Sequence, residues 1–263
     1  MTAERNDGPV GTGTLGKAMA VLETVALADR PMRFTDVLAI SGQPRGTLHR
    51  QMSHLVHEGL LELRADHVYV PGLRLLKLAS ASWARNEFRA VAAPFLEALH
   101  VETGETVHLG VLRGREIIYL DKVESRQAVR MNSQIGNASP VYCTGVGKAA
   151  LSTLDAAALD VILSGIEFQR FTPQTIVDRA TLLGELEAVR RNGVAFDREE
   201  HEPGIRCVAA PVCDAARSLV AGVSVTGPAY RVGQEKLDAW VPLVRKAADA
   251  IKNELDARLG PQR

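Results

Sequence analysis

Apolar residues in the first 72 positions follow three helical patterns, and a strand-like pattern comes after them. From Leu15 to Ala28 they recur at helical spacing, and Pro31 interrupts the pattern. The predicted elements are helices over 15–28, 35–41 and 44–58 and short strands over 60–64 and 67–70. Three helices followed by a β-ribbon predict a winged helix-turn-helix over residues 15–72. The polar, glycine-rich residues 1–14 predict a flexible arm in front of it.

Threonine, proline and glycine mark the ends of the second and third predicted helices. Thr35 is the predicted N-cap of the second helix, because its hydroxyl can accept a hydrogen bond from a free amide of the first turn. Gly42 is the predicted C-terminal stop of that helix. Pro44 suits the first turn of the third helix, and Gly59 ends it. The short turn between the two helices is typical of a helix-turn-helix.

From Leu73 onward the pattern predicts a linker helix and then a larger mixed domain. Helical spacing and positive charge over residues 73–89 predict a helix that connects two domains. The predicted strands cover 106–112, 116–121, 128–132, 194–197, 206–212 and 219–226. The predicted helices are one that has Pro94 in its first turns, one that begins near Gly147, 156–163, 180–192, and one that starts or kinks at Pro242. This order predicts an α+β domain over residues 90–260 with a central antiparallel sheet.

The composition excludes several classes of protein. The chain has 263 residues, and 46% of them are hydrophobic, which argues against disorder and collagen-like repeats. No apolar run approaches the roughly 20 residues that a membrane span needs, and the first residues lack the profile of a secretory signal. The three cysteines, Cys143, Cys207 and Cys213, cannot all pair within one chain. This favours a reducing cytoplasm.

The net charge of zero conceals an uneven distribution. Binding to the DNA backbone relies on Lys and Arg, so a neutral chain argues at first against a nucleic-acid partner. The formal charge is −1 over residues 1–72, +3 over 73–89 and −2 over the remainder. Residues 37–57 contain two arginines, three histidines and no acidic residue. A local basic face over the third predicted helix is therefore compatible with a neutral chain.

The third predicted helix is the sharpest functional candidate. Leu48, Met52 and Leu55 are spaced to pack inward. The outward face suits the major groove, where Arg can read guanine and Thr can contact a thymine methyl. The predicted DNA-binding residues are Arg45, Thr47, His49, Arg50 and Ser53. Winged helices also serve as protein-interaction or dimerisation modules, and this alternative stays open.

Three motifs that resemble cofactor or metal sites lack the required context. The G-x-G-x-x-G pattern at 11–16 has no strand before it. Gly145–Ala149 resembles a phosphate loop, but Ala149 stands where Ser or Thr must hold magnesium. The acidic run from Asp197 to Glu202, with Cys207, could form a metal site, although such runs are usually solvated. No catalytic residue, cofactor or metal is therefore predicted, and the chain is not expected to be an enzyme.

Motifs along nearly the whole chain, from about Leu15 to Leu259, resemble those of the IclR-type bacterial transcriptional regulators. In the first domain the resemblance rests on Gly42, Pro44, Thr47, Arg50, Leu55, Gly59, Leu60, Tyr69 and Gly72. In the second it rests on Glu105–Leu109, Tyr119–Ser125, Cys143–Ala149, Gly193, Asp197, Glu200, Cys207, Val208, Ala209, Val212 and Asp214. The positions that depart from the family pattern are Gln43, Gly46 and Cys213.

The resemblance implies a GAF-like effector-binding domain and homodimers that often pair into homotetramers. It places the effector pocket between the loop before the Gly-Lys helix and three strands. Carried over to this chain, the effector-binding residues are Thr144, Gly145, Val146, Asp197, Cys207, Ser224 and Thr226. The implied protein is cytoplasmic and associates with the bacterial nucleoid when it is bound to DNA.

The chemistry of these positions fits a small-molecule site. Amide groups at a helix start form an anion site, and Ser224 and Thr226 share one face of a strand. The predicted apolar walls are Leu109, Val129, Met131 and Ile205. Asp197 would repel a carboxylate unless one of the two is protonated or a hydroxyl or amine intervenes, which favours a hydroxylated organic acid. Alternatively, Cys207 is a small core residue and the two hydroxyls satisfy local backbone groups.

The sequence therefore predicts a sequence-specific transcriptional regulator whose dimer binds a palindromic double-stranded operator. A small, organic acid-like effector is expected to modulate this binding. The alternative is a small-molecule sensor or enzyme that uses the α+β domain, with the winged domain as a dimerisation module. Ligand turnover, or the absence of salt-dependent DNA binding, would favour that alternative. A purely structural, partner-binding protein would have no pocket.

Overall fold

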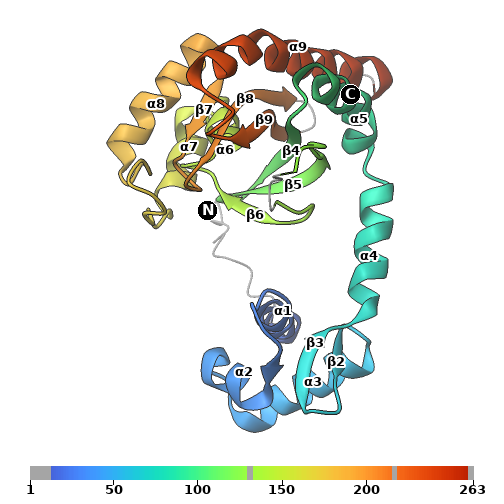
Figure 1. Cartoon of the computed structure of the whole chain (residues 1–263). Helices are drawn as coiled ribbons and strands as arrows, with labels where there is room; N and C mark the ends of the chain where they lie inside the picture. The colour runs from blue at the N-terminus through green and yellow to red at the C-terminus, as the bar shows by residue number, and fades with distance from the viewer. Residues whose placement is uncertain (1–12, 129–132, 215–217, 260–263) are drawn as a thin grey trace, which may run out of the picture. The chain divides into compact units, whose positions relative to one another are not determined.

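The computed structural model describes residues 13–128, 133–214 and 218–259. The chain forms two compact units that divide between Arg85 and Asn86 (Figure 1). None of the helices in the described ranges combines the length and the apolar composition that crossing a membrane requires.

The first unit is a winged helix-turn-helix followed by one more helix, as the sequence predicts. Its elements are α1 (Gly13–Ala26), β1 (Met32–Arg33), α2 (Phe34–Ser41), α3 (Arg45–His57), β2 (Leu61–Leu63), β3 (Val68–Pro71) and α4 (Leu73–Ala84). Strand β3 pairs antiparallel with β1 on one side and with β2 on the other. The core of this unit includes the buried side chains of Val21, Leu22, Val37, Leu48, Met52 and Leu55.

The predicted start of α2 is wrong by two residues. The N-cap residue is Arg33, and Thr35 lies inside the first turn. The Arg33 N–H donates a hydrogen bond to the Asp36 carboxylate at 2.9 Å, so an acidic side chain in the first turn supplies the cap interaction. The predicted stop is confirmed, because Gly42 has a φ of 61° in the left-handed region.

The predicted linker helix over residues 73–89 is not continuous. Helix α4 ends at Ala84, and α5 (Glu87–Thr103) begins after Asn86. The Asn86 side chain accepts a hydrogen bond from the Arg89 N–H at 2.9 Å, which satisfies a free amide of the new helix. An asparagine cap within the apparent helical pattern therefore separates the two helices.

The second unit is an α+β domain around one antiparallel sheet, as predicted. Its further elements are β4 (Thr106–Arg113), β5 (Glu116–Val123), β6 (Ala138–Pro140), α6 (Gly145–Ser152), α7 (Ala156–Leu163), α8 (Arg179–Asn192), β7 (Ala195–Arg198), β8 (Ile205–Asp214), β9 (Leu219–Pro228) and α9 (Gln234–Leu259). The strand order is β6-β5-β4-β9-β8-β7. Helix α9 continues through Pro242 instead of starting there. The strand predicted over 128–132 falls almost entirely on residues outside the described ranges.

Helices cover both faces of the six-stranded sheet (Figure 1). Helices α5 and α9 pack on the face that is formed by Val107, Leu109, Val111, Val208, Val223 and Val225. Helix α6 packs on the opposite face, with α7 and α8 behind it. Successive strand residues point to opposite faces, so both layers are built from the same strands.

Glycines let α6 lie unusually close to the sheet. A β-carbon at Gly110 of β4 would lie 2.5 Å from Ile117 Cγ2 and 2.8 Å from Val146 Cγ1. A β-carbon at Gly145 would lie 2.5 Å from Cys207 Sγ. Real β-carbons do not approach other atoms so closely, and the start of α6 therefore reaches the strands because these side chains are absent.

Candidate functional site

A polar cavity of about 150 Å³ lies between the start of α6 and the sheet. Each of the seven residues that the resemblance implied as effector-binding lines it: Thr144, Gly145, Val146, Asp197, Cys207, Ser224 and Thr226. They come from three separate segments of the chain, namely residues 144–146, the β7–β8 hairpin and β9. The fold thus brings the predicted positions together around one space.

The strand register explains why these residues meet. Asp197 of β7 lies opposite Cys207 of β8, and Cys207 lies opposite Thr226 of β9. On the neighbouring row, Ser224 lies opposite His108 of β4. Directly opposed residues point to the same face of a sheet, so these side chains form two adjacent rows that look toward α6.

The start of α6 forms the other wall. Thr144 is the N-cap, and its Oγ1 accepts a hydrogen bond from the Gly147 N–H at 3.2 Å and donates one to the Pro140 carbonyl at 2.8 Å. Gly145 and Val146 occupy the first turn and line the cavity. The partial positive charge of a helix N-terminus therefore points toward the cavity, which favours an anionic ligand group.

Several lining residues were not predicted from the sequence. They are His108, Tyr119, Ser133, Asn137, Ala138, Ser139, His201 and Glu202. His108 had a usable signal, since it alternates with apolar residues in the same way as Ser224 and Thr226 do on β9. The others depend on the pairing of β5 with β4 and β6 and on the β7–β8 turn, which no local pattern reveals.

Of the four predicted apolar walls, one lines the cavity and one does not. Ile205 lines it. The prediction for Leu109 is wrong, because it follows His108 on β4 and therefore points into the core with α5 and α9. Val129 and Met131 lie outside the described residues.

Burial keeps the ionisable groups of the cavity mostly neutral. It raises the pKa of Asp197 from its ordinary 3.8 to about 7, although a hydrogen bond from the Glu200 N–H at 2.8 Å opposes this. Burial, helped by the charge of Lys122, lowers the pKa of His108 to about 3. Burial also raises the pKa values of Tyr119 and Cys207. At neutral pH the cavity thus offers uncharged hydroxyl, imidazole and thiol groups around the Asp197 carboxyl group, which can hold its proton.

His108 is held in place by contacts on both sides of its ring. Its Nε2 lies 2.7 Å from Ser133 Oγ, and its Nδ1 lies 3.4 Å from Thr226 Oγ1. The Tyr119 ring lies 4.9 Å from the imidazole, centroid to centroid. These contacts give the cavity one aromatic wall with hydrogen-bonding groups at its edge.

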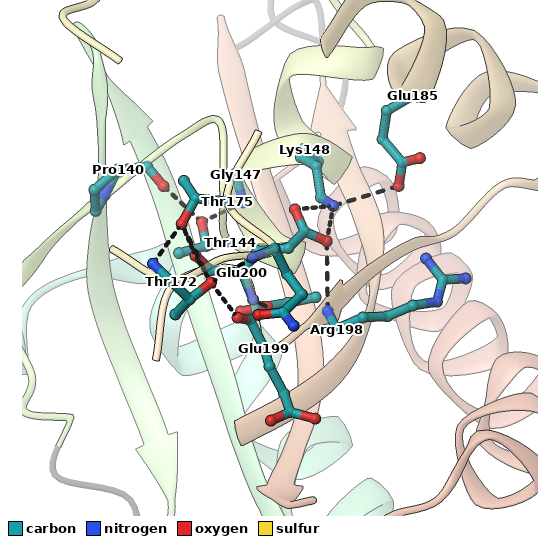
Figure 2. Close-up of polar contacts among 12 residues, drawn as sticks. Pro140, Thr144, Gly147, Lys148, Thr172, Thr175, Glu185, Arg198, Glu199 and Glu200 are labelled. Atoms are coloured by element: carbon teal, nitrogen blue, oxygen red, sulfur yellow. Dashed lines mark hydrogen bonds and ion pairs between the residues drawn. The ribbon is translucent and has the colours of Figure 1, made fainter. Parts of the chain in front are cut away.

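A buried ion pair lies beside the cavity without lining it. The Lys148 ammonium is 2.6 and 2.7 Å from the two oxygens of Glu200 and 3.3 Å from Glu185 Oε1 (Figure 2). Lys148 is fully buried, and Glu200 is nearly so. The sequence offered only the Gly-Lys motif as a signal for this pair, because 52 residues separate its members.

The acidic side chains of the run from Asp197 to Glu202 have other partners. Glu199 binds Arg206 at 2.7 Å, and Glu200 binds Lys148. In the described parts of the chain, no group of three or more His, Cys, Asp and Glu side chains is placed to hold a metal ion.

On α3 the predicted inward and outward faces are separated. Leu48, Met52 and Leu55 are buried, as predicted. Arg45, His49, Arg50 and Ser53 are exposed, and Thr47 is half-buried.

The Phe34 ring of α2 supports two of these exposed residues. The Arg45 guanidinium lies 5.3 Å from the ring centroid, and the His49 imidazole meets the ring edge-on at 5.8 Å. His54 and His57 of the last turn are also exposed and were not predicted as contacts. The acid-free segment therefore presents exposed arginine and histidine side chains.

A winged helix-turn-helix followed in the same polypeptide by an α+β domain with a polar pocket is typical of transcriptional regulators that respond to a small ligand. Residues 14–65 match the IclR helix-turn-helix domain, and residues 81–253 match the family described as bacterial transcriptional regulator IclR, C-terminal. The chain belongs to the IclR family. It is a transcriptional regulator with a helix-turn-helix DNA-binding domain and a C-terminal effector domain.

Relatives extend over nearly the whole chain. The transcriptional regulator XynR of Escherichia coli strain K12 is 30% identical over 240 residues, which are 91% of this chain and 95% of XynR. The structure of the Thermotoga maritima IclR is 32% identical, covers 92% of this chain and 98% of its own, and has a TM-score of 0.69. An IclR homologue of Microbacterium hydrocarbonoxydans, complexed with 4-hydroxybenzoate, is 25% identical, covers 93% and 99%, and has a TM-score of 0.75.

Proposed function

We propose that this regulator binds a palindromic operator as a homodimer, or as a dimer of dimers, and that a small hydroxylated organic acid modulates the binding. In this proposal residues 15–72 contact DNA and residues 90–260 bind the effector. The observation that carries it is the convergence of Thr144, Asp197 and Ser224, with their neighbours, on one cavity. An effector that favours one arrangement of the dimer would shift the population that can span two half-sites.

Helix α3 is the proposed reader of the major groove. Arg45, Thr47, His49, Arg50 and Ser53 are the proposed contacts. Four of these side chains are exposed, and no acidic residue occurs between Val37 and His57 to repel phosphate. Because the chain has little excess positive charge, non-specific binding should be weak, and affinity should depend on the spacing of two half-sites.

The cavity supports a small effector that carries both a carboxylate and a hydroxyl. An apolar cavity of about 150 Å³ in another protein accommodates benzene, so this one suits a ligand of about one ring. The amides of Gly145 and Val146 are the proposed carboxylate site, with Cys207 beside them. Ser224 and Thr226 are the proposed partners of the effector hydroxyl. Protonated Asp197 can donate to the ligand, which removes the repulsion expected from a charged carboxylate.

The known ligand of one relative fits this chemistry. The Microbacterium hydrocarbonoxydans homologue is complexed with 4-hydroxybenzoate, which has one ring, one carboxylate and one hydroxyl. For this chain we propose the class of such acids and not that compound. The neutral state of His108, Tyr119 and Cys207 offers no activated nucleophile, so we propose that the domain binds its effector without converting it. We also propose that the protein is cytoplasmic and associates with the nucleoid when it is bound to DNA.

Selection of genomic DNA fragments by the full-length protein, followed by gel-shift titration at two salt concentrations, tests the DNA-binding role. Arg50→Ala should weaken specific binding by about 1–3 kcal/mol, that is roughly 5- to 150-fold, if Arg50 reads a base. Arg30→Ala removes an exposed arginine outside α3 and serves as the matched control. Equal operator affinity of Arg50→Ala and the wild type would contradict the role of Arg50.

Thermal-shift screening of small hydroxy acids, 4-hydroxybenzoate included, tests the effector role. An acid that binds the wild type should also change its operator affinity. Ser224→Ala combined with Asp197→Ala should abolish this response and keep operator binding in the absence of the acid. Loss of both properties together would show a folding defect, and an unchanged response would contradict the proposed pocket.

A further inference from the structure

Lys148, Glu185 and Glu200 form a charged cluster beside the cavity, and Lys148 and Glu200 are buried. Lys148 is fully buried, and its ammonium binds both oxygens of Glu200, with Glu185 as a third member (Figure 2). Replacing such a pair by apolar side chains of similar volume is often neutral or stabilising, because burial of two charges offsets their attraction. Fold stability alone therefore does not account for it.

The pair joins two segments that form opposite walls of the cavity. Lys148 lies one helical turn after Thr144, and its N–H donates to the Thr144 carbonyl at 2.9 Å. Lys148 therefore belongs to α6, the helix whose first turn lines the cavity. Glu200 lies in the β7–β8 turn, where its backbone N–H donates to Asp197 Oδ1 at 2.8 Å. One ion pair thus connects the start of α6 to the residue whose amide orients Asp197.

The β7–β8 turn has an uncommon backbone conformation and is held from several sides. Glu199 has a φ of 66°, which side-chain-bearing residues rarely adopt. Thr175 Oγ1 donates to the Glu200 carbonyl at 2.7 Å, and Thr172 Oγ1 donates to the Glu199 carbonyl at 2.7 Å (Figure 2). The two threonines hold the backbone of the turn, whereas Lys148 holds its one buried acidic side chain.

We infer that Lys148 and Glu200 are positioning residues of the effector pocket, which fix the turn that orients Asp197 against the first turn of α6. The inference rests on the proposed function, since it assigns both residues to the same pocket. Neither residue lines the cavity, so each acts through Asp197 and through the α6 start.

The pair also acts on the charge of Asp197. The ammonium of Lys148 lowers the pKa of Asp197, and the carboxylate of Glu200 raises it. The other ionisable groups that face this carboxylate are Cys143 before α6, Cys207 of β8 and Tyr119 of β5. His201 contributes a backbone hydrogen bond to it. The charges of the two residues therefore act on the pKa of Asp197 in opposite directions, and the Glu200 amide that the pair holds in place lowers it.

Titration of Asp197 in the full-length protein tests the inference without any effector. Carbon-13 NMR of the side-chain carboxyl, assigned with Asp197→Asn, gives its midpoint between about pH 5 and about pH 9. Lys148→Met should raise the midpoint by about one unit, because it removes the ammonium and releases the Glu200 amide, and both stabilise the charged carboxylate. Glu200→Gln should raise it less, because loss of the Glu200 charge acts in the opposite direction to loss of the amide hydrogen bond. Midpoints that equal the wild-type value in both folded variants would overturn the inference.

A charge-balanced double variant remains useful if either single variant fails to fold. Lys148→Met with Glu200→Gln removes both charges and leaves no lone buried ion. The amide at position 200 should then exchange with solvent about tenfold faster, because the turn has lost its side-chain anchor. Wild-type exchange and a wild-type Asp197 midpoint in this double variant would overturn the positioning role.

The matched control removes a second ion pair of the same unit, in which Glu105 is buried and Arg231 is half-buried. Arg231 binds Glu105 through two hydrogen bonds of 2.6 and 2.7 Å, and neither residue lines the cavity. Arg231→Met with Glu105→Gln should leave the Asp197 midpoint and the exchange at position 200 unchanged. Equal changes in this control would show general loosening and would also overturn the inference. These measurements use no DNA and no effector. Failure of the proposed function would therefore appear separately, in the thermal-shift screen, as a wild-type protein that binds none of the acids.

Discussion

Along β4, residues 107, 109 and 111 point toward α5 and α9, whereas residues 106, 108 and 110 point toward α6. On the first face the strand contributes two valines and a leucine to a continuous apolar core. On the second face it contributes a threonine, a histidine and a glycine, and a polar cavity lies beside them. The same contrast recurs on β9, where Val223 and Val225 alternate with Ser224 and Thr226.

The contrast shows that one face of the sheet mainly stabilises the fold, whereas part of the other face borders the proposed ligand site. Apolar side chains that fill the first face contribute the hydrophobic free energy of the domain, at about 0.8 kcal/mol per buried methylene. The second face places groups that form hydrogen bonds around an unfilled space, which contributes less to folding and can contribute to ligand binding. Substitutions of adjacent residues should therefore have different effects on stability and on effector response.

The largest expected effect is on the apolar face. Leu109→Ala should lower the free energy of unfolding by about 2–5 kcal/mol, because Leu109 is fully buried and its removal leaves a cavity. Urea denaturation followed by circular dichroism measures this. Val101→Ala is the matched control, since Val101 is 80% exposed on α5 and should change stability by less than about 0.5 kcal/mol. A Leu109→Ala cost as small as that of Val101→Ala would break the comparison.

On the polar face, Asp197 should make stability depend on pH. Burial raises its pKa from 3.8 to about 7, so the folded state holds a proton that the unfolded state has released. This contribution to stability is complete below about pH 4 and is lost as the pH rises through about 7. Each unit of the shift corresponds to roughly 1.4 kcal/mol. Asp197→Asn should therefore remove a decline in the free energy of unfolding between these pH values.

Urea denaturation of both proteins at several pH values checks the sign. Asp178 gives the matched control, because hydrogen bonds from Thr181 lower its pKa at an exposed helix cap. Asp178→Asn should change the pH dependence only on the acid side, where wild-type Asp178 gains its proton. If Asp197→Asn kept the full decline between about pH 4 and about pH 7, another group would be responsible for it.

Local patterns in the sequence were sufficient for part of this picture. The alternating pattern along β9 predicts that Ser224 and Thr226 share one face, and the structure confirms this. Gly42 and Gly59 correctly predict where α2 and α3 end. Alternation of polar and apolar residues does not say which face of the sheet holds the pocket. For this reason the sequence-based prediction for Leu109 is wrong. The face is decided by the pairing of β4 with β9, whose residues are more than 100 positions apart.

The remaining features of the site depend on distant packing. Lys148 meets Glu200 across 52 residues, and no periodicity reveals which buried lysine finds which carboxylate. Tyr119 reaches the cavity after a register shift in the β4–β5 pairing between Leu109 and Gly110. Such a shift changes which residues face α6, so its position must be known before the lining can be assigned.

A methyl group at the closest approach of the two layers should have a smaller effect than Leu109→Ala. Gly110→Ala should destabilise the domain by about 1–3 kcal/mol, because the new β-carbon would lie 2.5 Å from Ile117 Cγ2 and 2.8 Å from Val146 Cγ1. Gly184→Ala in α8 is the control, since nothing lies within 4 Å of its β-carbon position. That change should be neutral or stabilise by up to about 1 kcal/mol, as an alanine in a helix does. Equal melting temperatures of both variants would show that α6 can move away from the sheet at no cost.

The smallest expected change in stability comes from Ser224→Ala, compared with Val223→Ala beside it. Both residues are buried, but within the described residues the side-chain partner of the Ser224 hydroxyl is Thr226 Oγ1, at 3.5 Å. Loss of so weak a bond should cost less than about 1 kcal/mol, whereas Val223→Ala removes apolar groups worth about 1.6 kcal/mol, with a cavity penalty in addition. The effector response should show the reverse order, since only Ser224 faces the cavity. If Ser224→Ala destabilised the protein as much as Val223→Ala and left the response intact, its hydroxyl would satisfy the fold, and the pocket would have to bind its ligand without it.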